Sequence, residues 1–407
     1  MEKKTAKVPK LRFPGFAGDW EQRKLGELGE IVTGSTPSTQ YAEYYSGNGI
    51  PWVTPTDIVE LTIASTAKKL SSKGALVGRI VPPKTILVTC IASIGKNAML
   101  TVKGSFNQQI NGLVPSAEYD PYFLLSESLL WSKKMKQQAA AGTMQIVNKT
   151  SFAVMTTMVP KYEEQQKIGE FFTDIDNLVT LYQRKLTHLQ AKKKGLLQKM
   201  FPEQGECFPE LRFPGFTDAW EQRKLGEIAT FAKGSGFSKN DLRDEGTPII
   251  LYGRLYTKYQ AIISEVDTYA EPRGNVLYST GNEVIVPASG ETADDIAIAS
   301  AVVAPGIMLG GALNIVYPKD NIDATFVALS ISNGEPQKEL AKKAQGKSVV
   351  HLHNSDLKEV TLAYPSNDEQ KKISCYFTKI DHLITLYQRK LGHLQEQKKA
   401  LLQQMFV

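Results

Sequence analysis

Polar side chains that suit hydrogen bonding to nucleic-acid bases gather in the loops of two separate segments of the chain. Asparagine and glutamine can form two hydrogen bonds with adenine, and arginine can do the same with guanine. Side chains of these types in loops also satisfy backbone groups or water, so both roles stay open for each residue. The first segment offers Thr54, Thr56, Lys96, Asn107, Gln108 and Gln109. The second offers Tyr252, Arg254, Tyr256, Lys258, Ser289, Thr292, Lys347, His351 and His353.

Sequence motifs for catalysis are absent. An adenine methyltransferase needs an Asn/Asp-Pro-Pro-aromatic loop, but the one Pro-Pro pair lies in "VPPK" at residues 81–84. A nucleotide-binding loop needs GxxxxGK[ST], but the "GKS" at residues 346–348 has Ala341 in place of the first glycine. His351 and His353 lack further partners at metal-ligand spacing. We therefore expect no catalytic centre, no metal and no cofactor in this chain.

The bulk properties are those of a soluble globular protein. The chain has 407 residues and a net charge of +6, which allows a polyanionic partner without requiring one. Its three widely spaced cysteines fit a reducing compartment, and the basic N-terminal residues lack the apolar stretch of a signal peptide. The uncharged stretch at residues 296–317 is interrupted by Pro305 and Gly306, which favours two buried strands over a membrane helix. Together these features predict a cytoplasmic protein.

The same eight residues, "WEQRKLGE", occur at residues 20–27 and again at 220–227. This repeat belongs to a larger frame that surrounds two inserts of barely similar sequence. The frame covers residues 9–35, 160–201, 209–235 and 365–406, and the inserts cover residues 36–159 and 236–364. Similar frames around unrelated inserts indicate a duplication in which frame and insert have different roles.

The longer repeat predicts two helices of about 40 residues, each roughly 60 Å long. Its apolar residues alternate at spacings of four and three, which is a heptad seam. Lys193 and Lys398 stand at the one skipped seam position, and Asp174 and Asp176 lie beside the seam, where a solvated or interfacial role is expected. The seam residues are Ile168, Phe172, Ile175, Val179, Tyr182, Leu186 and Leu189 in the first copy, and Ile373, Phe377, Ile380, Ile384, Tyr387, Leu391 and Leu394 in the second.

A narrow apolar seam requires a partner helix, and two partners are open. One is the other copy in the same chain, where a pseudo-twofold relation between equal halves requires an antiparallel pair. The alternative is self-association between chains. The lysine run at residues 192–194 is expected to be a solvated helix face.

Both inserts are typical of mixed domains, in which short apolar runs alternate with turn residues. Residues 122–140 predict a helix in the first insert, and a helix is expected near residues 322–344 in the second. The fold class is therefore α+β, with two mixed α/β domains separated and joined by two long antiparallel helices in a pseudo-twofold repeat. The expected boundaries are residues 1–160 for the first domain, 161–208 for the central helix and linker, 209–365 for the second domain and 366–407 for the C-terminal helix.

The combination of motifs resembles a known family. "EQQKIGEFFTDID" at residues 164–176, its echo "EQKKISCYFTKID" at 369–381, and the twin openings "LRFPGF" followed by "WEQRKLGE" are specific in combination. They look like the specificity subunit of bacterial type I restriction–modification systems, and the resemblance covers essentially the whole chain.

The resemblance implies that each variable domain is a target-recognition domain that reads one half of an asymmetric, bipartite site in double-stranded DNA. The paired helices would set the spacing between the halves and dock two methyltransferase subunits, which restriction subunits would join. S-adenosylmethionine, ATP and Mg²⁺ would then belong to those partner subunits.

The openings would contribute aromatic anchors to this docking surface, since exposed aromatic side chains suit interfaces. The same rings could instead fill the core of each domain. The candidates are Phe13, Phe16, Trp20, Phe213, Phe216 and Trp220.

Two other classes of function remain open. A stand-alone DNA-binding regulator would bind its site tightly as a pure chain, whereas a specificity subunit would bind weakly until the methyltransferase is added. A scaffold built around the helix pair would not respond to DNA at all.

Overall fold

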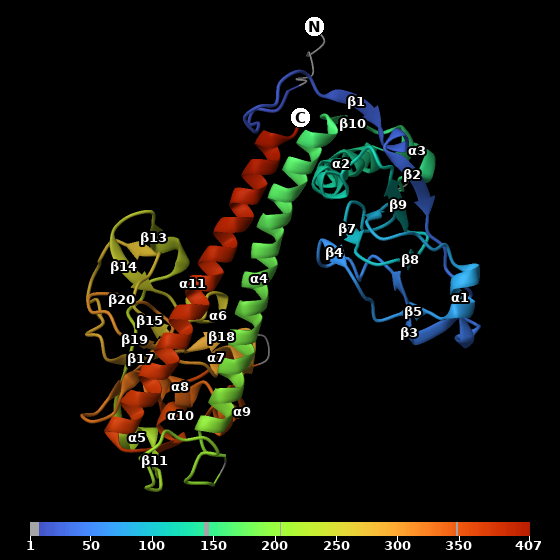
Figure 1. The fold of residues 1–407 in the computed structure, drawn as a ribbon. Helices are drawn as coiled ribbons and strands as arrows, with labels where there is room; N and C mark the ends of the chain where they lie inside the picture. Colours follow the sequence, from blue (N-terminus) through green and yellow to red (C-terminus); the bar gives the residue numbers. More distant parts are fainter. Residues whose placement is uncertain (1–7, 142–145, 204, 347–348) are drawn as a thin grey trace. The chain divides into compact units, whose positions relative to one another are not determined.

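The computed structural model describes residues 8–141, 146–203, 205–346 and 349–407. The chain forms two compact units, Met1–Tyr182 with Lys390–Val407, and Gln183–Arg389 (Figure 1). Each unit contains one variable insert together with parts of both long helices, α4 (Tyr162–Met200) and α11 (Asn367–Met405).

The main sheet of the first unit has five strands, and its central strand is buried along its whole length. That strand, β6, consists of β-branched and aliphatic residues that suit a strand covered on both faces. The order in the sheet is β2 (Gly29–Thr33), β9 (Ile110–Pro115), β6 (Ile86–Thr89), β7 (Asn97–Leu100) and β4 (Thr62–Ile63). All neighbours are antiparallel except β7 and β4, which run parallel.

A second sheet, a two-stranded ribbon and short helices complete the first unit. Helix α2 packs against β6 and β7 of the main sheet (Figure 1). The second sheet is β5 (Lys69–Leu70), β3 (Tyr45–Val53) and β8 (Ser105–Phe106), and the ribbon is β1 (Glu21–Lys24) with β10 (Thr156–Val159). The helices are η1 (Leu25–Glu27), η2 (Ala42–Tyr44), α1 (Ser72–Val77), α2 (Pro121–Ala141) and α3 (Lys149–Val154).

The second unit has a five-stranded main sheet, a four-stranded sheet and two ribbons. The main sheet is β12 (Ala229–Lys233), β21 (Leu313–Pro318), β17 (Glu283–Pro287), β19 (Ser300–Val302) and β15 (Ile262–Ile263). The other sheet is β13 (Leu242–Arg243), β16 (Tyr269–Ala270), β14 (Thr247–Ile250) and β20 (Met308–Leu309), and the ribbons are β18 (Ser289–Gly290) with β22 (Val350–His351) and β11 (Glu221–Lys224) with β23 (Thr361–Tyr364). The helices are α5 (Leu225–Ile228), η3 (Lys239–Asp241), α6 (Arg254–Thr257), α7 (Ala293–Ile296), α8 (Ala324–Ile331), α9 (Gly334–Lys343) and α10 (Asn354–Lys358).

The two inserts share one topology although their sequences barely resemble each other. Strands β2, β9, β6, β7 and β4 match β12, β21, β17, β19 and β15 in order, and the last pair is the parallel one in both sheets. In the smaller sheets, β3 pairs in parallel with β8 as β14 does with β20. The prediction of two mixed domains of similar plan is confirmed.

Two local predictions need correction. The uncharged stretch at residues 296–317 forms three strands rather than two. In the sequence, β20 lies between β19 and β21, and it pairs with β14 of the smaller sheet. The helix expected near residues 322–344 is broken into α8 and α9 at Gly334, whose φ of +62° lies in the left-handed region. Within the described part of the chain, no helix is long and apolar enough to cross a membrane.

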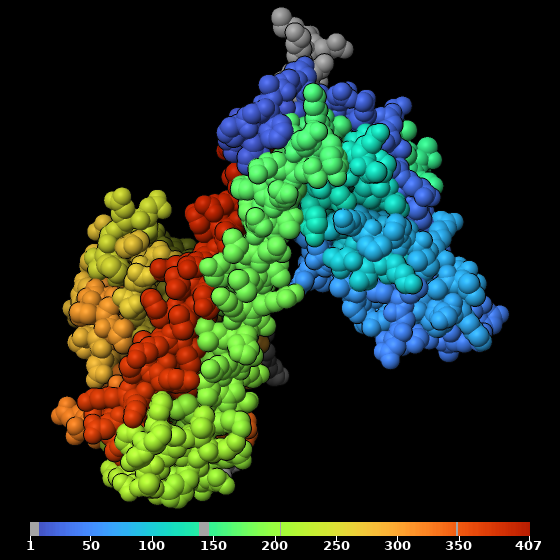
Figure 2. All heavy atoms as spheres, viewed as in Figure 1, coloured from blue at the N-terminus to red at the C-terminus, as the bar shows by residue number. Residues whose placement is uncertain are grey.

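The long helices pair antiparallel within each unit. In the first unit, Phe172 contacts Phe406 and Asp176 contacts Lys398, so the contacts recede along α11 as they advance along α4. In the second unit, the end of α4 packs with Ile373 and Phe377 at the start of α11. Figure 2 shows the two helices in side-by-side contact over the second unit. Within each unit, α4 and α11 of the same chain are therefore in contact, and both helices have 39 residues.

Each opening segment is tied to the start of a long helix by an arginine. Arg12 donates from Nε and Nη2 to the two carboxylate oxygens of Glu164, at 2.7 and 2.6 Å. Arg212 makes the same paired contact with Glu369, at 2.8 Å for both bonds. Both glutamates are buried, and a paired guanidinium compensates for the loss of their hydration. Opening and helix therefore form one structural frame, which explains why they repeat together.

Candidate nucleic-acid interface

Three loops of the first unit meet at one end of its domain. The backbone N–H of Asn107 donates to the carbonyl of Val53, at the end of β3, at 2.9 Å. The N–H of Cys90, in the β6–β7 connection, donates to the carbonyl of Gln109 at 2.7 Å. Lys96 Nζ, from the same connection, donates to the carbonyl of Pro55 at 3.1 Å. The candidates in the first insert, which sequence places far apart, are thus brought together: Thr54, Thr56, Lys96, Asn107, Gln108 and Gln109.

These six residues differ in how freely they can meet a ligand. Thr56, Lys96 and Gln108 are exposed. Thr54 is engaged by its own turn, in which its hydroxyl donates to Asp57 Oδ2 at 2.6 Å. Exposure makes Thr56, Lys96 and Gln108 the better candidates for base or phosphate contact. Each also has a contact within the domain: the Thr56 hydroxyl with that of Thr54, Lys96 Nζ with the carbonyl of Pro55, and Gln108 Oε1 with the hydroxyl of Thr36.

Asn107 shapes the loop rather than projecting from it. It is buried, with 8% of its surface exposed, and its Nδ2 donates to Gln109 Oε1 at 2.9 Å. Its Oδ1 in turn accepts from the backbone N–H of Gln109 at 3.1 Å. Both ends of its amide are used inside the loop, so of the two roles left open for such side chains the structure favours loop shaping for Asn107.

Arg79 lies at the same end of the domain and was missed by sequence reasoning. This exposed residue follows α1, and its backbone N–H donates to Ser35 Oγ at 3.1 Å. Ser35 in turn donates from its backbone to the carbonyl of Phe106, next to the loop of Asn107 and Gln108. A single arginine after a glycine carries no sequence signal, because only the strand pairing brings it to this surface.

The second unit presents the topologically equivalent end. The N–H of Gly310 donates to the carbonyl of Ile250 at 2.9 Å, and the N–H of Ala288 donates to the carbonyl of Ala312 at 2.8 Å. The segment after β14 therefore meets the β17–β19 and β20–β21 connections, as the segment after β3 meets its counterparts in the first unit. The candidates on this end are Tyr252, Arg254, Tyr256, Lys258, Ser289, Thr292, His351 and His353; Lys347 lies outside the described residues.

Several of these side chains lie close together. The rings of Tyr252 and Tyr256 are 6.1 Å apart. Burial raises the pKa of Tyr256, with smaller contributions from Tyr252 and from the carboxylates of Glu291 and Asp295. Two aromatic rings with hydroxyl groups therefore lie together on the segment that follows β14.

Ser289 and His351 face each other across the β18–β22 ribbon, and His351 is exposed. Thr292 is the N-cap residue that precedes α7, where its hydroxyl donates to Asp295 Oδ2 at 2.7 Å and accepts from the backbone N–H of Asp295. His353 is the N-cap residue that precedes α10, and its backbone N–H donates to Asp356 Oδ2 at 2.8 Å. Thr292 therefore has a helix-capping role, whereas His351 is open to a ligand. No group of three or more metal-ligating side chains is found in the described ranges.

Arg254 is not open to a base in this structure. Only 9% of its side chain is exposed, and its Nη1 lies 2.6 Å from Asp267 Oδ1. Lys258 pairs with the other oxygen of the same carboxylate. Both cations are thus held by Asp267, and neither is available without breaking that contact.

The openings place their aromatic residues in two environments. Trp20 and Trp220 are buried, each with 2% of its surface exposed, so of the two roles left open for these rings the structure favours the core role for both tryptophans. The core holds them in matched ring clusters, Trp20 with Phe123 and Phe406, and Trp220 with Phe326 and Phe201.

The other four aromatic residues of the openings, Phe13, Phe16, Phe213 and Phe216, are half-buried. The Phe13 ring meets Phe171 of α4 edge to face at 5.5 Å. Next to this contact a groove of about 380 Å³ is lined by Phe171, Ile175, Leu394, Gln397, Ala400, Leu401 and Gln404. The frame therefore offers a partly apolar surface beside the first opening.

Comparison with known proteins agrees with this architecture. A family model described as the type I restriction modification DNA specificity domain matches twice, at residues 17–191 and 217–396. The chain is 22% identical over 404 residues to the type I restriction enzyme MjaVIII specificity subunit of Methanocaldococcus jannaschii, covering 96% of this chain and 92% of that one. It is 32% identical over 164 residues to the HindI specificity subunit of Haemophilus influenzae, covering 38% of this chain and 35% of that one.

The fold is also that of a solved relative. The crystal structure of a type I restriction–modification S subunit from M. genitalium aligns with a TM-score of 0.63 at 16% identity, covering 98% of this chain and 99% of that one. Because both inserts and most of each long helix lie within the matched ranges, the chain belongs to the DNA specificity subunits of type I restriction–modification systems, which recognise DNA and have no catalytic centre of their own.

Proposed function

We propose that this specificity subunit reads an asymmetric, bipartite DNA target, with one half contacted by each domain. The observation that carries the proposal is the repetition of one loop-bearing end on one topology with different side chains. The first end presents Thr56, Lys96 and Gln108, and the second presents tyrosines and His351. Different hydrogen-bonding groups on equivalent scaffolds would select different base sequences.

The long helices would set the spacing between the two half-sites. A helix of 39 residues is about 60 Å long, and half-sites one turn of duplex apart are separated by about 34 Å. The antiparallel contacts between α4 and α11 within each unit support the role of these helices as a spacer. The length of the helices, rather than any base contact, would then determine the number of unread base pairs.

The repeated frame would dock two methyltransferase subunits, one on each copy. The half-buried Phe13 and Phe16, and their repeats Phe213 and Phe216, would contribute apolar area to this contact. The groove beside Phe171 supports the same role in the first copy. Restriction subunits would join through the methyltransferases. S-adenosylmethionine, ATP and Mg²⁺ would be bound by those partners, since no nucleotide-binding or methyltransferase motif occurs in this sequence.

Sequencing of N6-methyladenine in a host with and without this gene, in the presence of its methyltransferase, tests the proposal. We expect methylation to disappear from one asymmetric motif made of two short halves around a fixed gap. An unchanged methylation pattern, with tight binding of the isolated chain to one site, would instead support a stand-alone regulator.

A further inference from the structure

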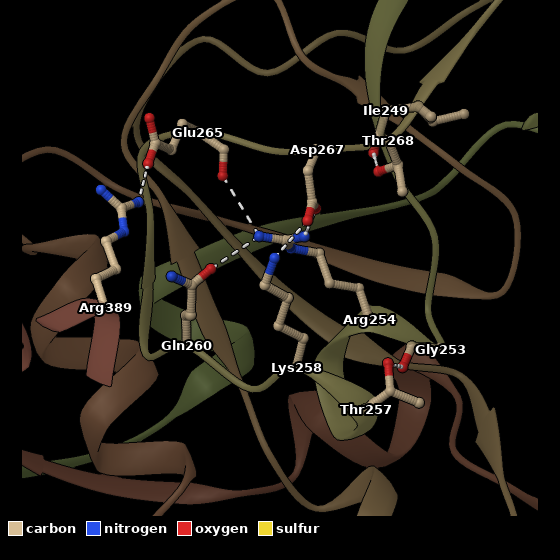
Figure 3. A network of polar contacts seen from close by, with 10 residues as sticks. All are labelled: Ile249, Gly253, Arg254, Thr257, Lys258, Gln260, Glu265, Asp267, Thr268 and Arg389. Atoms are coloured by element: carbon tan, nitrogen blue, oxygen red, sulfur yellow. Dashed lines mark hydrogen bonds and ion pairs between the residues drawn. The ribbon is translucent and has the colours of Figure 1, made fainter. Parts of the chain in front are cut away.

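A network of polar contacts surrounds Asp267 in the second unit (Figure 3). Arg254 Nη1 donates to Asp267 Oδ1 at 2.6 Å, and Lys258 Nζ donates to Asp267 Oδ2. Arg254 Nη2 also donates to Gln260 Oε1 at 2.9 Å and to the carbonyl of Glu265 at 3.5 Å. One carboxylate therefore holds two cations that lie four residues apart, on the segment that follows β14.

The electrostatics of the network favour an ionised Asp267 paired with both cations. Hydrogen bonds from Lys258 and then Arg254 lower the pKa of Asp267 to about 2, so the carboxylate is ionised at neutral pH. Arg254 is largely covered, whereas 56% of the Lys258 side chain is exposed. Without Asp267, Arg254 would lose its charge partner, and Lys258 would turn freely toward solvent or a phosphate.

The loop that carries Asp267 is itself fixed on both sides. Glu265 Oε1 accepts from Arg389 of α11 at 2.7 Å. Thr268 exchanges two bonds with Ile249 of β14: the N–H of Ile249 donates to the carbonyl of Thr268 at 2.9 Å, and the Thr268 hydroxyl donates to the carbonyl of Ile249 at 2.6 Å. Asp267 thus lies between a long helix and the strand that leads into the candidate reading segment.

The first unit fixes the equivalent segment in a different way. After β3, Asp57 Oδ2 accepts from the backbone N–H of Thr54 at 2.8 Å and from its hydroxyl at 2.6 Å. That carboxylate belongs to the segment it orders and holds no cation among the described contacts. In the second unit the ordering carboxylate comes from a separate loop, and its partners are charged.

We propose that Asp267 is the positioning residue of the second recognition domain: it holds Arg254 and Lys258, fixes the segment that presents Tyr252 and Tyr256 to DNA, and withholds the two cations from phosphates. The inference rests on the proposed function. Its consequence is a gain in specificity, because a freed lysine contacts any phosphate whatever the sequence.

Asp267→Asn tests this in the full chain bound to its methyltransferase. The probes are a duplex carrying the motif found by methylome sequencing and a scrambled duplex of the same length and composition. We expect binding to the motif to weaken about tenfold, while binding to the scrambled duplex strengthens and its log–log salt slope steepens by about 0.9 for each freed cation. Asp244→Asn removes an equal charge from an exposed site of the same unit. This control should change neither the ratio of the affinities for the two duplexes nor the salt slope of binding to the scrambled duplex.

Lys258→Gln provides a second test that does not disturb Asp267. A lysine already held by Asp267 contributes no phosphate contact, so this change alone should leave the salt slope unaltered. In the Asp267→Asn background the same change should remove the added slope. A slope that falls by about 0.9 on Lys258→Gln alone would show that Lys258 already binds phosphate, and would overturn the inference.

Equal strengthening of both duplexes by Asp267→Asn would also overturn it, since Asp267 would then only repel DNA. If Asp267→Asn does not fold, the salt slope of Lys258→Gln alone tests the inference. Failure of the proposed function can be distinguished from failure of this inference. It would be seen in the methylome experiment, as the absence of any methylated motif that depends on this gene.

Discussion

Lys193 of α4 forms an ion pair with Asp381 of α11, with 2.5 Å between Nζ and Oδ1, although it stands where the apolar seam of its own helix is interrupted. Lys398 and Asp176 form the equivalent pair, also at 2.5 Å. The repeat accounts for both, since Lys398 and Asp381 correspond to Lys193 and Asp176. Two copies of one helix satisfy each other in this way only when they run antiparallel.

Breaking one pair should destabilise the unit that contains it. Lys398→Met leaves the Asp176 carboxylate without its charge partner. Burial already raises the pKa of Asp176 above its usual value, although Lys398 opposes this shift. With a quarter of Asp176 exposed, we expect a loss of about 2 kcal/mol in free energy of unfolding. Lys193→Met should cost a similar amount through Asp381. Urea unfolding followed by circular dichroism measures both.

Charge reversal supplies the control for this prediction. Asp176→Lys and Lys398→Asp should each destabilise the protein, and the double variant should recover most of the loss. Additive losses in the double variant would show that the pair does not contribute to helix pairing.

The sequence predicted the fold well because its signals are local and repeated. The heptad spacing of Ile168, Phe172 and Ile175 identified the long helix directly. Even the interrupting lysines were visible, and Asp176 was noted beside the seam. The pairing of Lys398 with Asp176 was not predicted, because each lysine meets an aspartate of the other copy. Arg12 and Glu164 were missed for the same reason, since a contact across 152 residues leaves no spacing pattern.

The candidate site itself stays a prediction, but its clustering could be anticipated only in part. Residue type singled out loops that the fold brings together, since Lys96 and Gln108 lie on one end of the domain. It could not assign orientation, because Asn107 and Arg254 have the same chemistry whether they face solvent or close a loop. Arg79 shows the converse, since only strand pairing brings this ordinary exposed residue beside the loops.

Base reading and loop shaping can be separated at two neighbouring residues. Gln108→Ala removes an exposed amide and should cost about 1–3 kcal/mol of discrimination at one base pair, because a paired contact to adenine would be lost. Asn107→Ala removes bonds inside the loop and should reduce stability by about 1 kcal/mol, with weaker recognition of the entire half-site. Methylome sequencing of strains carrying each variant measures both effects.

The loss of base discrimination caused by Gln108→Ala should be confined to one half of the target. Gln108→Ala is expected to relax one base in the half read by the first domain and to leave the other half unchanged. Relaxation in both halves, or none, would contradict the assignment of this loop to one half-site.

Core and docking roles can be separated within one opening. Trp20→Ala should cost about 3–5 kcal/mol in stability, because the buried ring contacts Phe123 and Phe406 and leaves a cavity. Phe13→Ala should cost about 1 kcal/mol in stability but weaken methyltransferase binding, because Phe13 is only half-buried. Thermal unfolding and calorimetric titration with the methyltransferase measure the two effects. Phe213→Ala provides the matched change in the second opening, and normal binding by both variants would remove these rings from the docking surface.

Glu127 should give the first unit a pH-dependent stability near neutrality. The side chain is buried on α2, and Thr157 donates to its Oε1, while Oε2 has no hydrogen-bond partner among the described residues. Burial raises its pKa from 4.5 to about 7, despite the opposing hydrogen bond from Thr157. Between these values the folded protein keeps a proton that the unfolded chain releases. The contribution of Glu127 to stability is therefore greatest below pH 4.5, falls as the pH rises to about 7, and is constant above it.

Glu127→Gln, which keeps the shape without the titration, should remove this slope. Relative to the wild type, the variant should gain up to about 3 kcal/mol between pH 4.5 and 8. Other groups titrate in both proteins, so the difference between their unfolding free energies isolates Glu127. Glu118→Gln, an exposed change in the same unit, should leave the pH profile unaltered. A constant difference between wild type and Glu127→Gln across this range would mean that Glu127 is ionised in the folded state, with a counter-charge or water at Oε2 that compensates for its burial.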